Sequence, residues 1–136
     1  MILENIHCLL QFDDRGNLLA LVSKSSGRNY IVKDGCSLFR LTMTEIIENR
    51  VMPGTLALTG DMAEQIDFIQ QSQCLEIDYR NLDGMPVTVK CTIGFMDEEI
   101  HWNILIENKT RFAVSEIEYP VLLFKPYLGL NAESER

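Results

Sequence analysis

Strict alternation of apolar and polar residues in the second half of the chain is the feature that most constrains its fold. The apolar positions of its two longest runs are Val87, Val89, Cys91 and Ile93, then Ile100, Trp102, Ile104 and Ile106. A period of two places these side chains on one face of an extended strand. Because an acidic turn at 97–99 lies between the runs, the pattern predicts a hairpin of two long antiparallel strands.

Further strands are predicted at residues 5–12, 18–22, 29–32, 38–44 and 75–79, and at 112–123, which is rich in β-branched and aromatic residues. Between them lie turn signals rich in Asp, Asn, Ser and Gly, at residues 13–17, 25–28, 81–84 and 108–111. Two segments are ambiguous, because 44–49 can begin a short helix and 61–71 favours a helix by propensity. In an otherwise all-β chain we interpret 65–69 as a strand.

This density of strands predicts an all-β fold, an antiparallel two-sheet sandwich. More than eight candidate strands favour two stacked sheets over a closed barrel. A chain of 136 residues corresponds to one domain. We expect that domain to span residues 1–130 and to be followed by a polar, frayed tail at 131–136.

The charge balance excludes two classes of partner. Twelve Lys and Arg residues stand against twenty Asp and Glu, which gives a formal net charge of −8. Nucleic acids and anionic membrane surfaces both require clustered basic residues, so neither is an expected partner. No apolar run is long enough to span a bilayer, and the first residues lack the pattern of a signal peptide. The expected location is the cytoplasm.

Residues that could hold a metal or perform catalysis are sparse. The cysteines are Cys8, Cys36, Cys74 and Cys91, and none forms a Cys-x-x-Cys pair, so we expect four unpaired thiols. His7 and His101 lack metal-ligand spacing and are expected to be solvated. Asp13, Asp14 and Asn17 do not match a calcium loop and are interpreted as turn formers. The sequence therefore predicts no metal, no cofactor and no catalytic residue.

One strand offers a candidate binding surface. Trp102 shares parity with its isoleucine neighbours, which favours a place in the core over an exposed platform for a sugar ring. The opposite face of that strand presents His101, Asn103 and Leu105. This mixed face is the predicted surface for carbohydrate binding or for contact with another domain.

Three stretches together resemble the N-terminal β-sandwich domain of glycoside hydrolases. The first is residues 5–30, a strand, an acidic turn with Gly16, and a strand that ends in a Lys-x-x-Gly-x-x-Tyr-like turn. The second combines residues 75–79 with 87–93. The third combines 100–110 with 114–120, which is similar to a Trp-x-Ile-x-Ile-x-Asn ending followed by Ile and Pro.

The resemblance implies a supersandwich of the galactose mutarotase-like type. In such hydrolases this domain precedes a barrel that carries the catalytic carboxylates, and 136 residues are too few for a barrel of about 250. The chain is therefore expected to be non-catalytic, and the implied partners are a carbohydrate and a catalytic barrel domain. A stand-alone carbohydrate-binding or protein-interaction sandwich remains an alternative, and a small sugar isomerase is a third.

The apolar segment near the C-terminus suggests self-association. Residues 121–124 carry no polar alternation, so both faces of this segment require cover. We therefore expect a homodimer held partly through residues 121–128.

Overall fold

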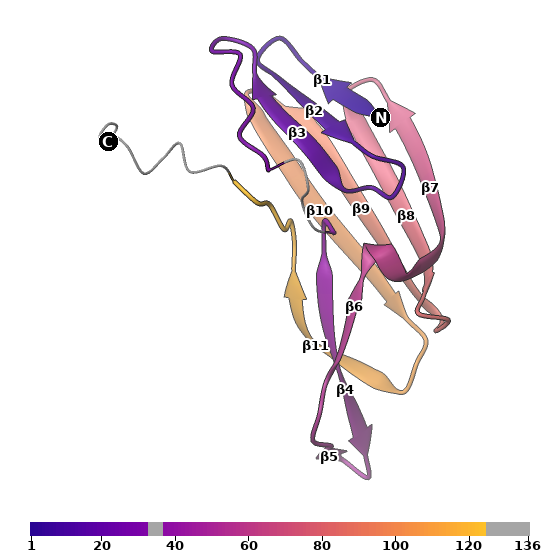
Figure 1. Ribbon diagram of the computed structural model, residues 1–136. Helices are drawn as coiled ribbons and strands as arrows, with labels where there is room; N and C mark the ends of the chain where they lie inside the picture. Colours follow the sequence, from indigo (N-terminus) through magenta and orange to yellow (C-terminus); the bar gives the residue numbers. More distant parts are fainter. Residues whose placement is uncertain (33–36, 125–136) are drawn as a thin grey trace, which may run out of the picture.

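Two layers of antiparallel strands make up the protein in its computed structural model, which describes residues 1–32 and 37–124 (Figure 1). One layer is a single four-stranded sheet in the order β10-β9-β8-β7. Its strands are β7 (Ala63–Gln71), β8 (Cys74–Leu82), β9 (Val87–Met96) and β10 (Glu99–Asn108).

The second layer consists of two smaller sheets that lie side by side across the first (Figure 1). The three-stranded sheet contains β1 (Ile2–Glu4), β2 (Cys8–Phe12) and β3 (Leu18–Ser23). In the other, β4 (Arg40–Ile47) pairs on one side with β11 (Phe112–Glu118) and on the other with β5 (Arg50–Val51) and β6 (Leu56–Thr59). The predicted all-β antiparallel sandwich is confirmed, with its second layer divided in two.

The long hairpin predicted from alternation is formed by β9 and β10. Met96 pairs with Glu99 across a two-residue turn, and Asp97 there has φ 59°. The predicted inward row of β9, from Val87 to Ile93, is fully buried. Alternation therefore identified both the strands and the face that each turns to the core.

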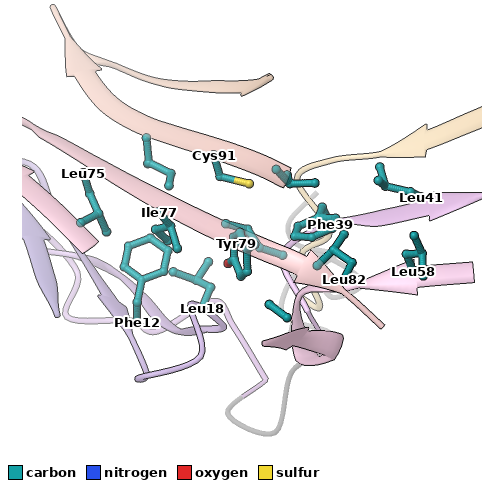
Figure 2. Packing of buried hydrophobic residues seen from close by; sticks show 14 of the residues in the cluster. Phe12, Leu18, Phe39, Leu41, Leu58, Leu75, Ile77, Tyr79, Leu82 and Cys91 are labelled. Carbon is teal, nitrogen blue, oxygen red and sulfur yellow. The ribbon is translucent and has the colours of Figure 1, made fainter. Parts of the chain in front are cut away.

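The core is continuous across all three sheets and is centred on Tyr79 of β8 (Figure 2). The Tyr79 ring is fully buried and meets the Phe39 ring edge-on, with 4.9 Å between centroids. Its hydroxyl donates a hydrogen bond to the Gly16 carbonyl at 3.3 Å. The ring thus joins the β2–β3 turn to the centre of the four-stranded sheet.

Two glycines allow the backbone to approach this ring. Gly16 has φ 79°, and a Cβ there would overlap the Tyr79 hydroxyl. At Gly60, in the 3₁₀ turn Gly60–Met62, a Cβ would lie 2.7 Å from Cε2 of Tyr79 and 2.9 Å from Oγ of Ser37. Arg15 connects the same two turns, because its Nη2 donates to the carbonyls of Asp61 at 2.8 Å and Ala63 at 3.1 Å.

The N-terminal strand predicted at residues 5–12 is wrong in part. The structure has a short hairpin instead, in which β1 pairs with β2 around a turn. Asn5 creates this turn, since its side-chain oxygen accepts hydrogen bonds from the backbone N–H groups of His7 and Cys8. Ile6, expected on the apolar face, is consequently 83% exposed.

The two ambiguous segments in the middle of the chain, 44–49 and 61–71, are mostly strand in the structure. β4 continues to Ile47 and ends at a tight turn where Glu48 and Asn49 both have positive φ, so no helix begins at 44. The strand predicted at 65–69 is confirmed, and in the structure it is longer and forms the whole of β7. The strand predicted at 29–32 is wrong, because only isolated bridges occur at Asn29 and Ile31.

The strand predicted at 112–123 stops early, at Glu118. The cis peptide bond between Tyr119 and Pro120 follows, and proline has no N–H to continue the ladder. Val121 then donates its N–H to the carbonyl of Leu38. The predicted tail at 131–136, with residues 125–130, lies outside the described residues. Within the described ranges, the structure contains no helix with the length and apolar character that crossing a membrane requires.

Candidate functional site

The three residues predicted from sequence lie together on the outer face of the four-stranded sheet. His101, Asn103 and Leu105 alternate along β10, and all three are exposed. Asn103 pairs with Thr92 of β9, and Leu105 pairs with Lys90. The predicted surface is therefore one continuous face.

His101 and Asn103 line one shallow hollow of this face. Its volume is about 370 Å³, and Cys74, Thr92 and Gly94 also contribute to its wall. Gly94 has no side chain, so the floor of the hollow comes close to the sheet backbone. The lining is mostly neutral and offers hydrogen-bond donors and acceptors from an imidazole, an amide and a hydroxyl.

Leu105 lines a second hollow of about 320 Å³ further along the same face. The other side chains around it are charged or hydroxylic, and they are Asp78, Arg80, Thr88, Lys90 and Glu107. Leu105 itself is 65% exposed and is the apolar member of this set. The structure thus divides the three predicted residues between two neighbouring hollows.

Asp78 is the unusual group in the second hollow. The residue is only 8% exposed, although it belongs to the outer face. One carboxylate oxygen, Oδ2, lies 3.9 Å from Nη2 of Arg80. The other, Oδ1, has no hydrogen-bond partner among the described residues. An unsatisfied buried acceptor costs about 1–3 kcal/mol.

Ion pairs connect the charged side chains of this face. Nε of Arg80 lies 3.6 Å from the carboxylate of Asp67, and Nζ of Lys90 lies 3.8 Å from that of Glu76. The basic groups are thus interspersed with acidic ones. Such a face suits a neutral polar ligand better than a polyanion.

The thiols and phenols with shifted pKa values are poorly suited to act as nucleophiles, because each pKa is raised. Burial raises the pKa of the Cys91 thiol to about 12, although a hydrogen bond with Tyr119 opposes the shift. Burial also raises the pKa of Cys8 and, more strongly, the pKa of Tyr79. Because the thiolate is the reactive form of cysteine, the raised pKa makes Cys91 a poor nucleophile at neutral pH.

The histidines each face one acidic side chain on the surface. Nε2 of His7 lies 3.6 Å from Oε1 of Glu98, and Nε2 of His101 lies 4.0 Å from Oε2 of Glu99. Within the described part of the chain, no group of three or more His, Cys, Asp or Glu residues is placed to hold a metal ion.

Trp102 faces inward, as its parity predicts, but it is half-buried. Its ring meets the Tyr119 ring edge-on, with 6.3 Å between centroids, and packs against the core from the open side of the sandwich. It does not belong to the outer face with His101 and Asn103.

We expect Trp102→Ala to lower the free energy of unfolding by about 2–3 kcal/mol, less than for a fully buried aromatic residue. Denaturant unfolding of the variant measures this loss. An unchanged unfolding midpoint would show that the ring contributes no packing energy.

Sequence reasoning missed the charged residues of the second hollow, above all Asp78, Arg80 and Lys90. The signal was available for Asp78 and Lys90, since each occupies a polar position in a strand whose apolar parity had been recognised, and Arg80 directly follows the strand predicted at 75–79. What was missing was the register, because only strand pairing places Asp78 opposite Lys90 and Lys90 opposite Leu105.

No family model and no curated protein matches this chain. What it binds is therefore inferred from its own side chains and their arrangement.

Proposed function

We propose that this chain is a non-catalytic binding domain that holds a carbohydrate on the outer face of its four-stranded sheet. The observation that carries the proposal is the second hollow, where Asp78, whose Oδ1 has no hydrogen-bond partner among the described residues, lies among Arg80, Lys90 and Leu105. The described cysteines are unpaired, which agrees with the proposed location in the cytoplasm.

The chemistry of the hollow matches a polyhydroxyl ligand. Sugar hydroxyls donate and accept hydrogen bonds, so they can serve carboxylates and basic groups at once. The exposed methyl groups of Leu105 can cover the C–H face of a sugar ring.

The resemblance to the N-terminal domain of glycoside hydrolases supports the same class of ligand. On this proposal the sandwich is of the galactose mutarotase-like supersandwich type and accompanies a catalytic barrel in a longer enzyme. The chain itself hydrolyses no glycoside.

A second candidate function, docking onto such a larger partner, is favoured by one observation. The β4–β5 hairpin extends beyond the rest of the sandwich (Figure 1), and it exposes Ile46, Ile47 and Val51. Ile46 and Val51 pair across the hairpin, so they share one face. An apolar pair at a protruding tip suits insertion between elements of another domain. The isomerase alternative has less support, because His7 and His101 face their acids on open surface.

Binding is tested by nuclear magnetic resonance with the whole chain. A panel of soluble oligosaccharides of glucose, galactose, mannose and xylose is titrated in, and backbone amide shifts are followed. The expected result is saturable shifts that cluster at Thr88, Lys90 and Leu105. If no oligosaccharide shifts these amides, or if the shifts cluster elsewhere, the proposal is overturned.

A matched pair of variants sharpens the test. We expect Asp78→Asn to weaken binding about tenfold or more, because hydrogen bonds to a charged group contribute about 1.5–3 kcal/mol. Asp67→Asn is the control, since Asp67 also pairs with Arg80 but does not line the hollow. Its dissociation constant should remain within about twofold of the wild type. Equal effects of the two variants would contradict a specific role for Asp78.

A further inference from the structure

β10 is an edge strand. The backbone groups on its free side form no hydrogen bond with any described residue. It hydrogen-bonds to β9 along its whole length, and its other side has no strand partner in the described part of the chain. At ten residues it is as long as β9 and longer than the other strands. Long unpaired edges are templates for pairing with another chain.

The direction of the free backbone groups follows from the ladder. Lys109 donates its N–H to the Pro86 carbonyl at 3.1 Å, which continues the register of β10 with β9. In an antiparallel ladder, alternate residues point both backbone groups to the same neighbour. The backbone N–H and C=O groups of the odd-numbered residues of β10 therefore point to β9. Those of the even-numbered residues Trp102, Ile104 and Ile106 point to the open edge.

The same even-numbered residues form an apolar row that the fold leaves partly uncovered. Ile100, Trp102, Ile104 and Ile106 are each half-buried, whereas the neighbouring row of β9 is completely buried. The second layer thus covers β9 fully and β10 only in part. The open edge combines free hydrogen-bonding groups with exposed apolar surface.

We infer that a second copy of this chain occupies the edge, with the two β10 strands antiparallel about a two-fold axis at Ile104. Ile104 then exchanges both backbone hydrogen bonds with its own equivalent. Trp102 pairs with Ile106 of the second copy, so the apolar rows of the two molecules become continuous. The two four-stranded sheets merge into one of eight strands.

Charge complementarity favours this register over a register displaced by two positions. On the outer face it places Glu99 opposite Lys109 of the second copy, and His101 opposite Glu107. The register displaced by two positions, centred on Asn103, places Glu99 opposite Glu107 twice. Like charges directly opposite are destabilising, so the register centred on Ile104 is preferred.

Other surfaces of the described chain are less suited to this pairing. Near the other edge of the same sheet, the Gln70 side chain donates to the carbonyl of Ile2 at 2.6 Å and so connects β7 to β1. Of the segment 121–128 expected to form a dimer, Val121 and Leu123 already have backbone partners within the chain, and 125–128 lie outside the described residues. Dimerisation through that segment remains a separate prediction.

Charge reversal with rescue tests the inference by sedimentation equilibrium. Lys109→Glu and Glu99→Lys should each raise the dimer dissociation constant by about tenfold, because each reverses two symmetric pairs. The double variant restores opposite charges and should return the constant to within about threefold of the wild type. A double variant as weak as the two single changes combined would overturn the register.

Ile104→Pro provides a separate test, since its missing N–H faces the open edge and leaves the β9 ladder intact. We expect this variant to remain folded, as judged by its far-ultraviolet circular dichroism, and to be monomeric at about 100 μM. Leu123→Ser is the control and should leave the dimer unchanged. A wild-type chain that is monomeric at this concentration, or a dimer lost only with Leu123→Ser, would overturn the inference.

Hydrogen exchange locates the interface directly. The amides of Trp102, Ile104 and Ile106 should become more protected as protein concentration rises, while that of Asn103, already bonded to β9, should not change. Because Trp102 is the sole tryptophan, its fluorescence should move to shorter wavelength over the same concentration range. If the protection of all three amides did not change with protein concentration, pairing of two β10 strands would be excluded. These readouts need no sugar, so they are independent of the proposed function.

Discussion

Replacement of Tyr79 by alanine is expected to lower the free energy of unfolding by about 3–5 kcal/mol, which is a large part of the stability of a domain of this size. The ring is fully buried where the two halves of the second layer meet the four-stranded sheet. Its removal leaves a cavity that three sheets would have to fill together. Denaturant unfolding followed by circular dichroism measures the loss.

Tyr79→Phe is the matched control, because it keeps the ring and removes only the hydroxyl. The lost interaction is the hydrogen bond to the Gly16 carbonyl, so the expected decrease is about 1 kcal/mol. If Tyr79→Phe destabilised the protein as much as Tyr79→Ala, the hydrogen bond and not ring packing would dominate at this position.

Gly16→Ala is expected to be the second most damaging change, with a loss of about 2–5 kcal/mol. The backbone there is left-handed, which costs a residue with a Cβ about 1–2 kcal/mol. The new methyl group would also overlap the Tyr79 hydroxyl, and overpacking adds about 1–3 kcal/mol. Thermal or denaturant unfolding measures the sum.

Gly27→Ala separates the two contributions. Gly27 has a similar φ of 74°, but a Cβ there meets no atom within 4 Å, so only the backbone contribution of about 1–2 kcal/mol remains. In the double variant Gly16→Ala with Tyr79→Phe, removal of the hydroxyl should relieve part of the overlap. The two changes together should then destabilise less than the sum of their separate effects. Strict additivity would contradict the overlap.

The β9–β10 hairpin was predictable from sequence because its inward positions, 87–93 and 100–106, follow one period of two, and the period also decides which face is buried. The N-terminal hairpin was not, because Ile6 fits the apolar parity while the Asn5 side chain imposes a turn. Two local hydrogen bonds that one amide oxygen accepts from the backbone thus override the hydrophobic pattern. The early end of β11 also has a local cause, since Pro120 interrupts a run that is rich in β-branched and aromatic residues.

The candidate site was predictable only along a single strand. His101, Asn103 and Leu105 follow from the parity of β10, but Asp78 and Lys90 join them through strand order and register. Alternation alone does not specify either. The burial of Asp78 is a further tertiary effect, because an aspartate at a polar position of a strand is expected to be exposed.

The close approach of two glycines to one tyrosine has a consequence for the search for homologues. Residues 16, 60 and 79 are far apart in the chain, yet their sizes are mutually restricted, since a Cβ at either glycine meets the Tyr79 ring or its hydroxyl. In divergent sequences these three positions should therefore covary. A chain that lacks glycine at 16 or 60 should carry a smaller side chain at 79, and this triplet is a fingerprint by which distant homologues can be recognised.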